Sequence, residues 1–286
     1  MRLVRLFLAF VALMVFGWSS GAAATPYYDV VIADSPVSYW RLGDAGNPAV
    51  DEVGGRNLSY HNSPAPGQPG AIAGDPDTAT DFSGGRIALT HSFDSALNTP
   101  EFSIEAWGKV TGDCENTAEC FQFFVTSRGV GEGYYLSLFT DPSTSVVRWD
   151  FTVGRGNFPG GWAGVEYSDG SLLSEVQNAW HHVVGTYDGT QARFFLDGVE
   201  VGSRVQDYVL NPGNLFAVGN GTDGNSVTRV PLTGAVDEVA YYDYALSGDR
   251  VSAHYQTGIG VIPEPSTALL LGLGLVGLSI KRRTHA

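Results

Sequence analysis

The sequence predicts an all-β protein, and two observations carry that prediction. First, the stretch 178–202 holds two runs rich in aromatic and β-branched residues, 180–187 and 192–196, each followed by an Asp-Gly pair. Asp-Gly supplies the positive φ angles of tight hairpin turns, so three successive antiparallel strands are expected there. Second, the 286 residues include 37 glycines and few long helical patterns, which favours short strands joined by turns.

Composition limits the number of domains and the class of partner. An all-β unit of this length commonly folds as one domain. The chain has 30 acidic and 16 basic residues, a formal net charge of −14, and no run of Lys or Arg away from its two ends. Nucleic-acid binding is therefore excluded, because a phosphate backbone is bound by a basic surface.

The first 24 residues have the pattern of a secretory signal peptide. Arg2 and Arg5 form the basic region, residues 6–16 the apolar region, and 22–24 a small-residue cleavage site. Cleavage after Ala24 would leave an exported domain at 25–258. An uncleaved membrane anchor is the alternative, although the apolar run is short for a span.

Strand patterns recur along the rest of the chain. Alternation is clearest at 102–110, with Ile104 on one face and Trp107 on the other. A glycine-rich stretch, 154–170, predicts a long surface loop. Ser247 is a candidate N-cap for a short helix ending near Gly258. The other expected strands lie at 27–42, 80–89, 121–128, 134–140, 146–153, 215–219 and 233–243.

Three motifs carry a family resemblance. They are W-H-H-V-x-x-T-Y-D-G at 180–189, F-x-L-D-G at 194–198 and G-x-x-D-E-V-x-x-Y-x-x-A-L-S at 234–247. Together they resemble the laminin G-like domains of the concanavalin A-like family, over about 27–258. The resemblance implies a two-sheet antiparallel jelly-roll sandwich.

The segment 259–286 resembles a PEP-CTERM sorting signal of Gram-negative bacteria that make exopolysaccharide. Its parts are Pro263, Glu264, Pro265 and Ser266, then an apolar run at 267–280 and a basic end. The resemblance implies processing by an exosortase. The apolar run would be about 21 Å long as a helix, short of the roughly 30 Å hydrocarbon layer. A transient anchor in the inner membrane is expected, with the domain outside and a final location at the cell surface or beyond it.

Cys114 and Cys120 are the only cysteines. In an exported chain they are expected to close a small disulfide loop. A metal site there is disfavoured, because no third or fourth ligand lies nearby in the sequence. The dipeptide His181-His182 is expected to be framework, because adjacent strand residues point to opposite faces and cannot easily share a ligand.

The family resemblance also implies one structural Ca²⁺ near the first strand, the following loop and the closing strand. The positions that match are Asp44, Asp51 and Asp237. Calcium takes carboxylate and carbonyl oxygens, which suits aspartates. The alternative is that these are turn and strand-end residues bonded to backbone.

Exposed aromatic residues could form a platform on which sugars stack. The candidates are Trp149, Phe158 and Trp162, and the alternative is that they belong to the core. No catalytic residue is assigned. The E-x-D-x-E motif of β-glucan hydrolases is absent, and Asp237 and Glu238 are expected to diverge because they are adjacent.

These observations favour an exported protein that binds carbohydrate or exopolysaccharide and catalyses no reaction. Two alternatives stay open. One is a glycan hydrolase or lyase on the same scaffold, and the other is a purely structural envelope protein.

Overall fold

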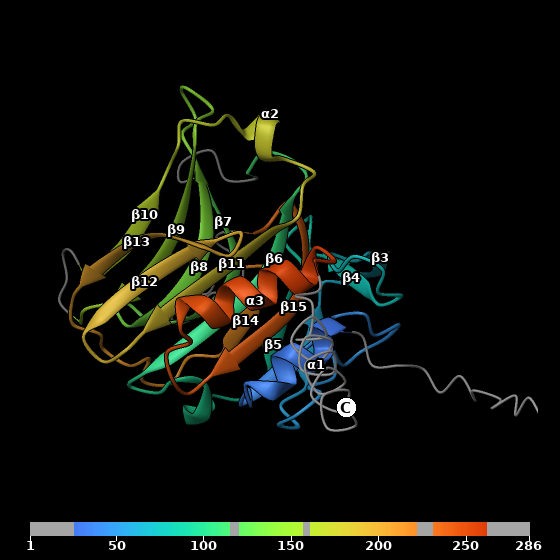
Figure 1. Cartoon of the computed structure of the whole chain (residues 1–286), viewed down its shortest axis with the longest axis horizontal. Coiled ribbons are helices and arrows are strands. Elements are labelled where there is room, and N and C mark those ends of the chain that lie inside the picture. Colours follow the sequence, from blue (N-terminus) through green and yellow to red (C-terminus); the bar gives the residue numbers. More distant parts are fainter. Residues whose placement is uncertain (1–25, 115–119, 157–160, 222–230, 262–286) are drawn as a thin grey trace, which may run out of the picture.

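The computed structural model describes residues 26–114, 120–156, 161–221 and 231–261, which form two antiparallel sheets packed face to face (Figure 1). One has eight strands in the order β13-β12-β11-β6-β15-β4-β3, with β1 also paired to β15. The other has seven, in the order β10-β9-β8-β7-β14-β5-β2. The predicted all-β sandwich is confirmed.

The strand bounds show how the chain alternates between the layers. The eight-stranded sheet contains β1 (Ser38–Trp40), β3 (Ala65–Pro69), β4 (Thr78–Asp81), β6 (Phe102–Val110), β11 (His181–Tyr187), β12 (Gln191–Leu196), β13 (Val199–Val205) and β15 (Gly234–Tyr242). The seven-stranded sheet contains β2 (Leu58–His61), β5 (Ile87–Thr90), β7 (Phe121–Arg128), β8 (Gly133–Thr140), β9 (Val147–Gly154), β10 (Trp162–Tyr167) and β14 (Phe216–Val218). The helices are α1 (Pro26–Ala33), η1 (Ser95–Leu97), α2 (Leu173–Val176) and α3 (Gly248–Gly258).

The two predicted hairpins join β11, β12 and β13 in antiparallel register. Asp197 and Gly198 both have positive φ, 50° and 76°, as the two central residues of a type I′ turn require. Gly189 supplies the positive φ, 86°, of the first turn. Turn chemistry in the sequence therefore sets this part of the topology.

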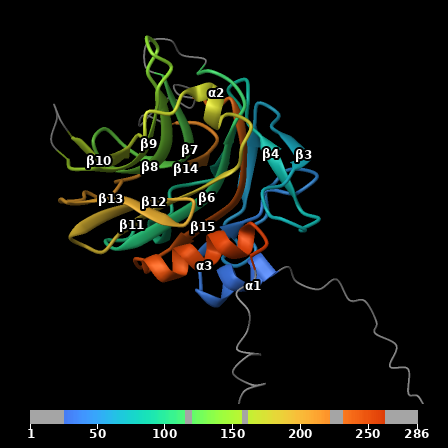
Figure 2. The same cartoon turned by 45° about the horizontal axis from the view of Figure 1, so that its top comes forward.

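The main core lies between the sheets, and a second core lies under two helices. Inward residues such as Ile104, Phe151 and Phe194 belong to the main core. On the opposite face of the eight-stranded sheet, Trp107 and Val184 are buried beneath α1 and α3. Figure 2 shows the two helices side by side against this face. The eight-stranded sheet is thus buried on both sides where the helices lie.

Two expectations about secondary structure are wrong. The stretch 27–42 was expected to be a strand, but its first part forms α1, and only 38–40 pairs, as β1. Tyr27 and Val31 are spaced four residues apart, so a helix can turn both toward the second core. The stretch 154–170 was expected to be a loop, but 162–167 forms the edge strand β10, because Ala163 and Val165 alternate into the interior.

Other sequence expectations concern the ends and the cysteines. Cys114 and Cys120 form a disulfide with their Cα atoms 5.3 Å apart. Ser247 caps α3, accepting a hydrogen bond from the backbone N–H of Arg250.

The signal peptide at 1–24, the motif at 263–266 and Phe158 lie outside the described residues. Among the residues that are described, no helix has the length and apolar character to span a membrane.

The two ends of the described domain meet on one side of the molecule. Pro26, at the start of α1, and Gly260, just past α3, border the same small cavity of about 60 Å³. Asp34, the residue directly after α1, ties this segment to α3, with an oxygen 2.7 Å from Nε of Arg250 and 2.9 Å from Nε2 of His254.

Candidate functional site

A buried polar network lies beneath α1 and α3, centred on Glu105 of β6. The Glu105 carboxylate accepts hydrogen bonds from the hydroxyls of Tyr27, at 2.9 Å, and Tyr242, at 3.0 Å. Its oxygens also lie 2.7 Å from Nε2 of His182 and 3.0 Å from Nδ1 of His254. All five side chains are fully buried. We call this set the Glu105 network.

The charges of the network stabilise one another. Burial alone would raise the pKa of Glu105, but the charge of His254 and the hydrogen bonds from both histidines hold it well below its usual value. Burial alone would lower the pKa of His254, but Glu105 and Asp34 raise it. Because both oxygens of Glu105 are already bonded inside the fold, the network holds the helices on the sheet.

His181 and His182 contact different carboxylates, as expected for neighbours on a strand. Nδ1 of His181 lies 2.9 Å from Oδ2 of Asp197, whereas His182 contacts Glu105 on the other face. The two imidazoles therefore do not share a ligand.

A bulge in β15 brings two carboxyls to the helix-covered side of the sheet. The register shifts between Asp237 and Ala240, and Glu238 has a φ of 52°. Asp237 accepts a hydrogen bond from the N–H of Ala71, and Glu238 accepts one from the hydroxyl of Tyr39. The expectation that these adjacent carboxyls diverge is wrong, because the extra residue of the bulge turns both to one face.

Arg41 supplies the positive charge for the acidic residues near this bulge. Its guanidinium lies 2.6 Å from Asp75, 3.1 Å from Asp77 and 3.0 Å from Glu238. Burial raises the pKa of Asp237 to about 7, and burial together with the charge of Asp237 raises that of Glu238. A fixed guanidinium thus compensates part of this acidic cluster, while burial disfavours the charged forms of Asp237 and Glu238.

The three aspartates considered for calcium each bond to backbone N–H groups. Asp51 accepts from Tyr39, Val53 and Arg56, Asp44 from Val50, and Asp237 from Ala71. In the described part of the chain, the one group of three or more His, Cys, Asp or Glu ligand atoms within 4.8 Å of each other is Asp113, Cys114 and Cys120. Its cysteines are in a disulfide, so they offer no thiolate. Asp44, Asp51 and Asp237 are not brought together as such a group, and calcium at these residues stays a prediction.

An aromatic patch lies on the face of the seven-stranded sheet that is turned away from the core. The rings of Trp162 and Tyr135 have centroids 5.2 Å apart, and Tyr135 meets Phe123 edge-on at 4.7 Å. The guanidinium of Arg128 lies 5.1 to 5.6 Å from the centroids of these three rings. We define the aromatic patch as Phe121, Phe123, Tyr135, Phe139 and Trp162.

Buried polar atoms without partners lie beside this patch. Oγ of Ser137 and Oδ2 of Asp150, on neighbouring strands in direct register, make no hydrogen bond with a described residue. Burial raises the pKa of Asp150 to about 7, although Nε of Arg148 lies 2.9 Å from its other oxygen. Glu166 stands opposite Asp150 on β10 and is exposed. Unpaired buried polar groups are uncommon in folded proteins and point to a missing partner.

The aromatic residues singled out in the sequence have different positions. Trp162 is partly exposed in the aromatic patch. Trp149 is only 4% exposed and stacks on Phe124 in the main core, so its ring is not offered to a ligand. Sequence reasoning missed Tyr135 and Phe123. The available signal was aromatic residues at every second position, as in F-Q-F at 121–123.

Comparisons with known proteins agree with this architecture. Residues 82–252 match the model of the concanavalin A-like lectin/glucanases superfamily, and residues 261–283 match the PEP-CTERM protein-sorting motif. No curated protein matches the sequence.

Several solved structures have a similar fold. The receptor binding domain of botulinum neurotoxin mosaic serotype C/D aligns with a TM-score of 0.55 at 15% identity, over 79% of this chain and 51% of that one. The binding domain of Paraclostridial Mosquitocidal Protein 1 aligns with a TM-score of 0.53 at 14% identity, over 77% and 52%. The chain thus spans about half the length of these structures, and at such identities the likeness shows the fold alone.

Proposed function

Because the chain belongs to the concanavalin A-like lectin/glucanases superfamily and carries a PEP-CTERM protein-sorting motif, we propose that it is an exported surface protein that binds carbohydrate. The observation that carries the proposal is the aromatic patch on the outer face of the seven-stranded sheet. Partly exposed rings there lie beside two buried atoms, Oγ of Ser137 and Oδ2 of Asp150, that have no hydrogen-bond partner among the described residues.

The patch combines the two kinds of contact that a sugar ring can use. The apolar face of a sugar can stack on Trp162, and the nearby Arg128 guanidinium can donate to hydroxyls. Ser137 adds a hydroxyl, and Asp150 adds a carboxyl whose pKa burial raises to about 7. Apolar surface with a few convergent polar groups is typical of ligand sites.

The sensitive test is a titration of the full chain with glycans found on an array, comparing Trp162→Ala with Trp180→Ala. Trp180 is a matched control, because it is also partly exposed and also has a cation over its ring, with Nζ of Lys109 4.5 Å from the ring centroid. It directly precedes β11 of the eight-stranded sheet and so lies away from the aromatic patch. We expect Trp162→Ala to weaken binding about tenfold, equivalent to about 1.4 kcal/mol, and Trp180→Ala to leave it unchanged. An array with no binding, or equal losses in both variants, would contradict carbohydrate binding at the patch.

The sorting motif supports export, transient anchoring through the tail, and processing by an exosortase, followed by display at the cell surface or release. Pro263 and Pro265 cannot continue a helix, since they lack the backbone N–H. An extended segment around Glu264 would suit recognition by a protease. Replacing Pro263, Glu264 and Pro265 by alanine should leave the protein in the inner membrane, as measured by membrane fractionation. Surface delivery equal to that of the unaltered chain would contradict this part of the proposal.

One observation favours a second candidate, a glycan hydrolase. Asp150, with its pKa raised to about 7 by burial, lies opposite the exposed Glu166, a pairing of an acid with a carboxylate. Against it, Nε of Arg148 lies 2.9 Å from Asp150 and 3.6 Å from Glu166, so both carboxyls already have a partner. Release of reducing ends that disappears in Asp150→Asn and Glu166→Gln would establish the hydrolase.

A further inference from the structure

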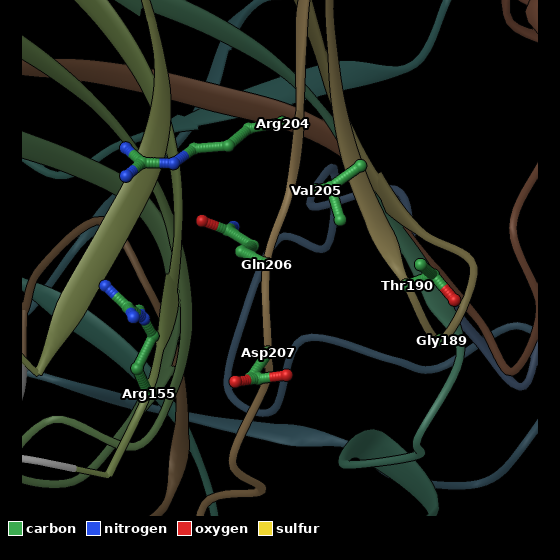
Figure 3. Close-up of a pocket in the computed structure, with 7 residues that line it drawn as sticks. All are labelled: Arg155, Gly189, Thr190, Arg204, Val205, Gln206 and Asp207. Carbon is green, nitrogen blue, oxygen red and sulfur yellow. The ribbon is translucent and has the colours of Figure 1, made fainter.

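A polar pocket opens between the two sheets, at the edge where β13 faces the seven-stranded sheet. It has a volume of about 440 Å³, within the range of small-molecule sites. Figure 3 shows its lining, and the residues used below are Arg155, Thr190, Arg204, Gln206 and Asp207. We call it the edge pocket.

The register of the strands turns Arg204 and Gln206 toward the interior. Arg204 pairs with Ala192, a residue of the main core, so both side chains lie on the inward face of the sheet. Gln206 follows two residues later, and its N–H donates to the carbonyl of Thr190. The hydrophobic layer between the sheets therefore gives way here to a guanidinium and an amide.

Another part of the lining of the edge pocket, Arg155, comes from the seven-stranded sheet. Phe151 and Val153 of β9 point into the main core, and Arg155 follows at the next alternate position. The N–H of Val209 donates to the carbonyl of Gly154, which ties the segment after β13 to the end of β9. Figure 3 shows the guanidinium groups of Arg155 and Arg204 on the same side as the amide of Gln206.

The two arginines of the edge pocket differ from the others that the structure describes. Arg155 and Arg204 are exposed and have no ion pair with a described residue. The remaining described arginines make ion pairs or, for one, lie over aromatic rings; they are Arg41, Arg56, Arg86, Arg128, Arg148, Arg193 and Arg250. In a chain with 30 acidic and 16 basic residues, two free guanidinium groups beside one cavity are available for an external anion.

Gln206 gives an independent indication of a ligand. The residue is 9% exposed, and in the part of the chain that the structure describes neither the oxygen nor the nitrogen of its amide has a hydrogen-bond partner. Its backbone is fully used, since the N–H bonds to Thr190 and the carbonyl accepts from the hydroxyl of Tyr187. A buried amide with both atoms unpaired is costly unless a bound molecule supplies the partners.

We propose that the edge pocket binds a sugar unit that carries an anionic group. The guanidinium groups of Arg155 and Arg204 would hold the carboxylate or sulfate, since their planar fork matches such oxyanions. The Gln206 amide would donate to and accept from sugar hydroxyls, and the exposed Asp207 and Thr190 would accept from others. That the anion belongs to a sugar rests on the proposed function, whereas the edge pocket and the aromatic patch are separate sites.

The test measures binding of four probes to the full chain purified in mild detergent. These are an oligouronate, a sulfated oligosaccharide, a neutral oligosaccharide of equal length, and inorganic sulfate. The variants are Arg155→Ala, Arg204→Ala and their combination. Arg193→Ala is the matched control, because Arg193 lies on the neighbouring strand, is partly exposed and pairs with Glu200 at 3.4 Å.

We expect one or both anionic saccharides to bind, with Kd raised about tenfold by each pocket variant and unchanged by Arg193→Ala. Binding should weaken as salt is added, because the contact is ionic. Gln206→Leu should also weaken binding, yet leave the melting temperature equal or higher, because it removes an unpaired amide. That pair of readouts separates a ligand-binding glutamine from a structural one.

Three results would overturn the assignment. One is anionic-saccharide binding that is unchanged in the double variant. Another is binding of inorganic sulfate alone, which would make the edge pocket a simple anion site. The third is a large loss of melting temperature in Gln206→Leu, which would show that the amide serves the fold. If glycans still bind and depend on Trp162, the proposed function stands while the edge pocket loses its role; if no glycan binds at all, the proposed function fails.

Discussion

The Glu105 network and the edge pocket each contain a buried polar side chain, but the two side chains differ in whether they have hydrogen-bond partners. Both oxygens of Glu105 are bonded to tyrosines or contacted by histidines of the same chain. Within the described ranges, both amide atoms of Gln206 are without a partner, and the two arginines beside it make no ion pair. The Glu105 carboxylate thus finds its partners within the fold, whereas the proposal assigns the partners of the Gln206 amide to another molecule.

The difference separates structural polar groups from ligand-binding ones in a way that burial alone does not. Glu105 and Gln206 are both buried. What differs is whether the surrounding elements close over the group. Two helices cover Glu105, while the edge pocket is bordered by turns and strand ends and stays open. Substitutions in the Glu105 network should therefore affect stability, and substitutions in the edge pocket should affect binding.

The largest effect is expected for Glu105→Gln. This change removes the buried negative charge that faces His254, leaving the imidazole with one carboxylate, Asp34, in place of two. Breaking one member of a buried charged set costs about 3–5 kcal/mol of unfolding free energy, measurable by urea denaturation. Glu101→Gln, an exposed neighbour ahead of the same strand, should change stability by less than about 0.5 kcal/mol. Equal losses in the two variants would contradict a closed network.

The pH dependence of that loss follows from the signs of the pKa shifts. The pKa of Glu105 is lowered on folding, so its contribution is full above about 4.5 and is lost as the pH falls through the folded value. The pKa of His254 is raised, so its contribution is full below about 6.5 and is lost as the pH rises through the folded value. The stability gap between wild type and Glu105→Gln should be widest between these two pH values. A gap independent of pH would contradict the assignment of charge to the network.

A smaller effect of opposite sign is expected for Asp237→Asn. Burial raises the pKa of Asp237 to about 7, so ionising it destabilises the fold progressively between about pH 4 and 7. Asparagine keeps the acceptor for the N–H of Ala71 and cannot ionise. The variant should be more stable than wild type by about 2 kcal/mol at pH 8, with the difference shrinking toward pH 5. A less stable variant at pH 8 would indicate that the charge of Asp237 is needed.

The smallest effect is expected on chelation. Arg41 already compensates the acidic residues next to the bulge, and Asp44, Asp51 and Asp237 do not lie together as a group of side-chain ligands. Adding a chelator to the full chain should leave the melting temperature unchanged. A clear decrease, reversed by Ca²⁺ and absent in Asp51→Asn, would show by mass action that calcium binds the folded state.

The sequence predicted what depends on local chemistry. The Asp-Gly turns and the alternation at 102–110 predicted their strands, and Ser247 predicted the start of α3. It failed where the same residues suit two structures. The run Tyr-Tyr-Asp-Val-Val-Ile at 27–32 has the β-branched residues of a strand. It forms a helix instead, because a helix turns Tyr27 and Val31 together into the second core and so covers the outer face of the eight-stranded sheet.

The candidate sites were less predictable for a physical reason. Trp162 was identified as an exposed aromatic, but Tyr135 and Arg128 join it only through strand pairing. Arg155 and Arg204 are 49 positions apart and carry no motif, so only the packing of the two sheets brings them to one cavity. The bulge at Asp237 and Glu238 likewise depends on the register of β15 against its neighbour.

The meeting of the two ends of the domain has a mechanical consequence. A pull transmitted along the tail beyond residue 261 would enter the domain at α3, which Asp34, directly after α1, holds through Arg250 and His254. The force would be resisted at one corner, without shearing the strands past each other. Because α1 and α3 cover the outer face of the eight-stranded sheet, a tether there leaves the opposite outer face, with the aromatic patch, directed away from the point of attachment.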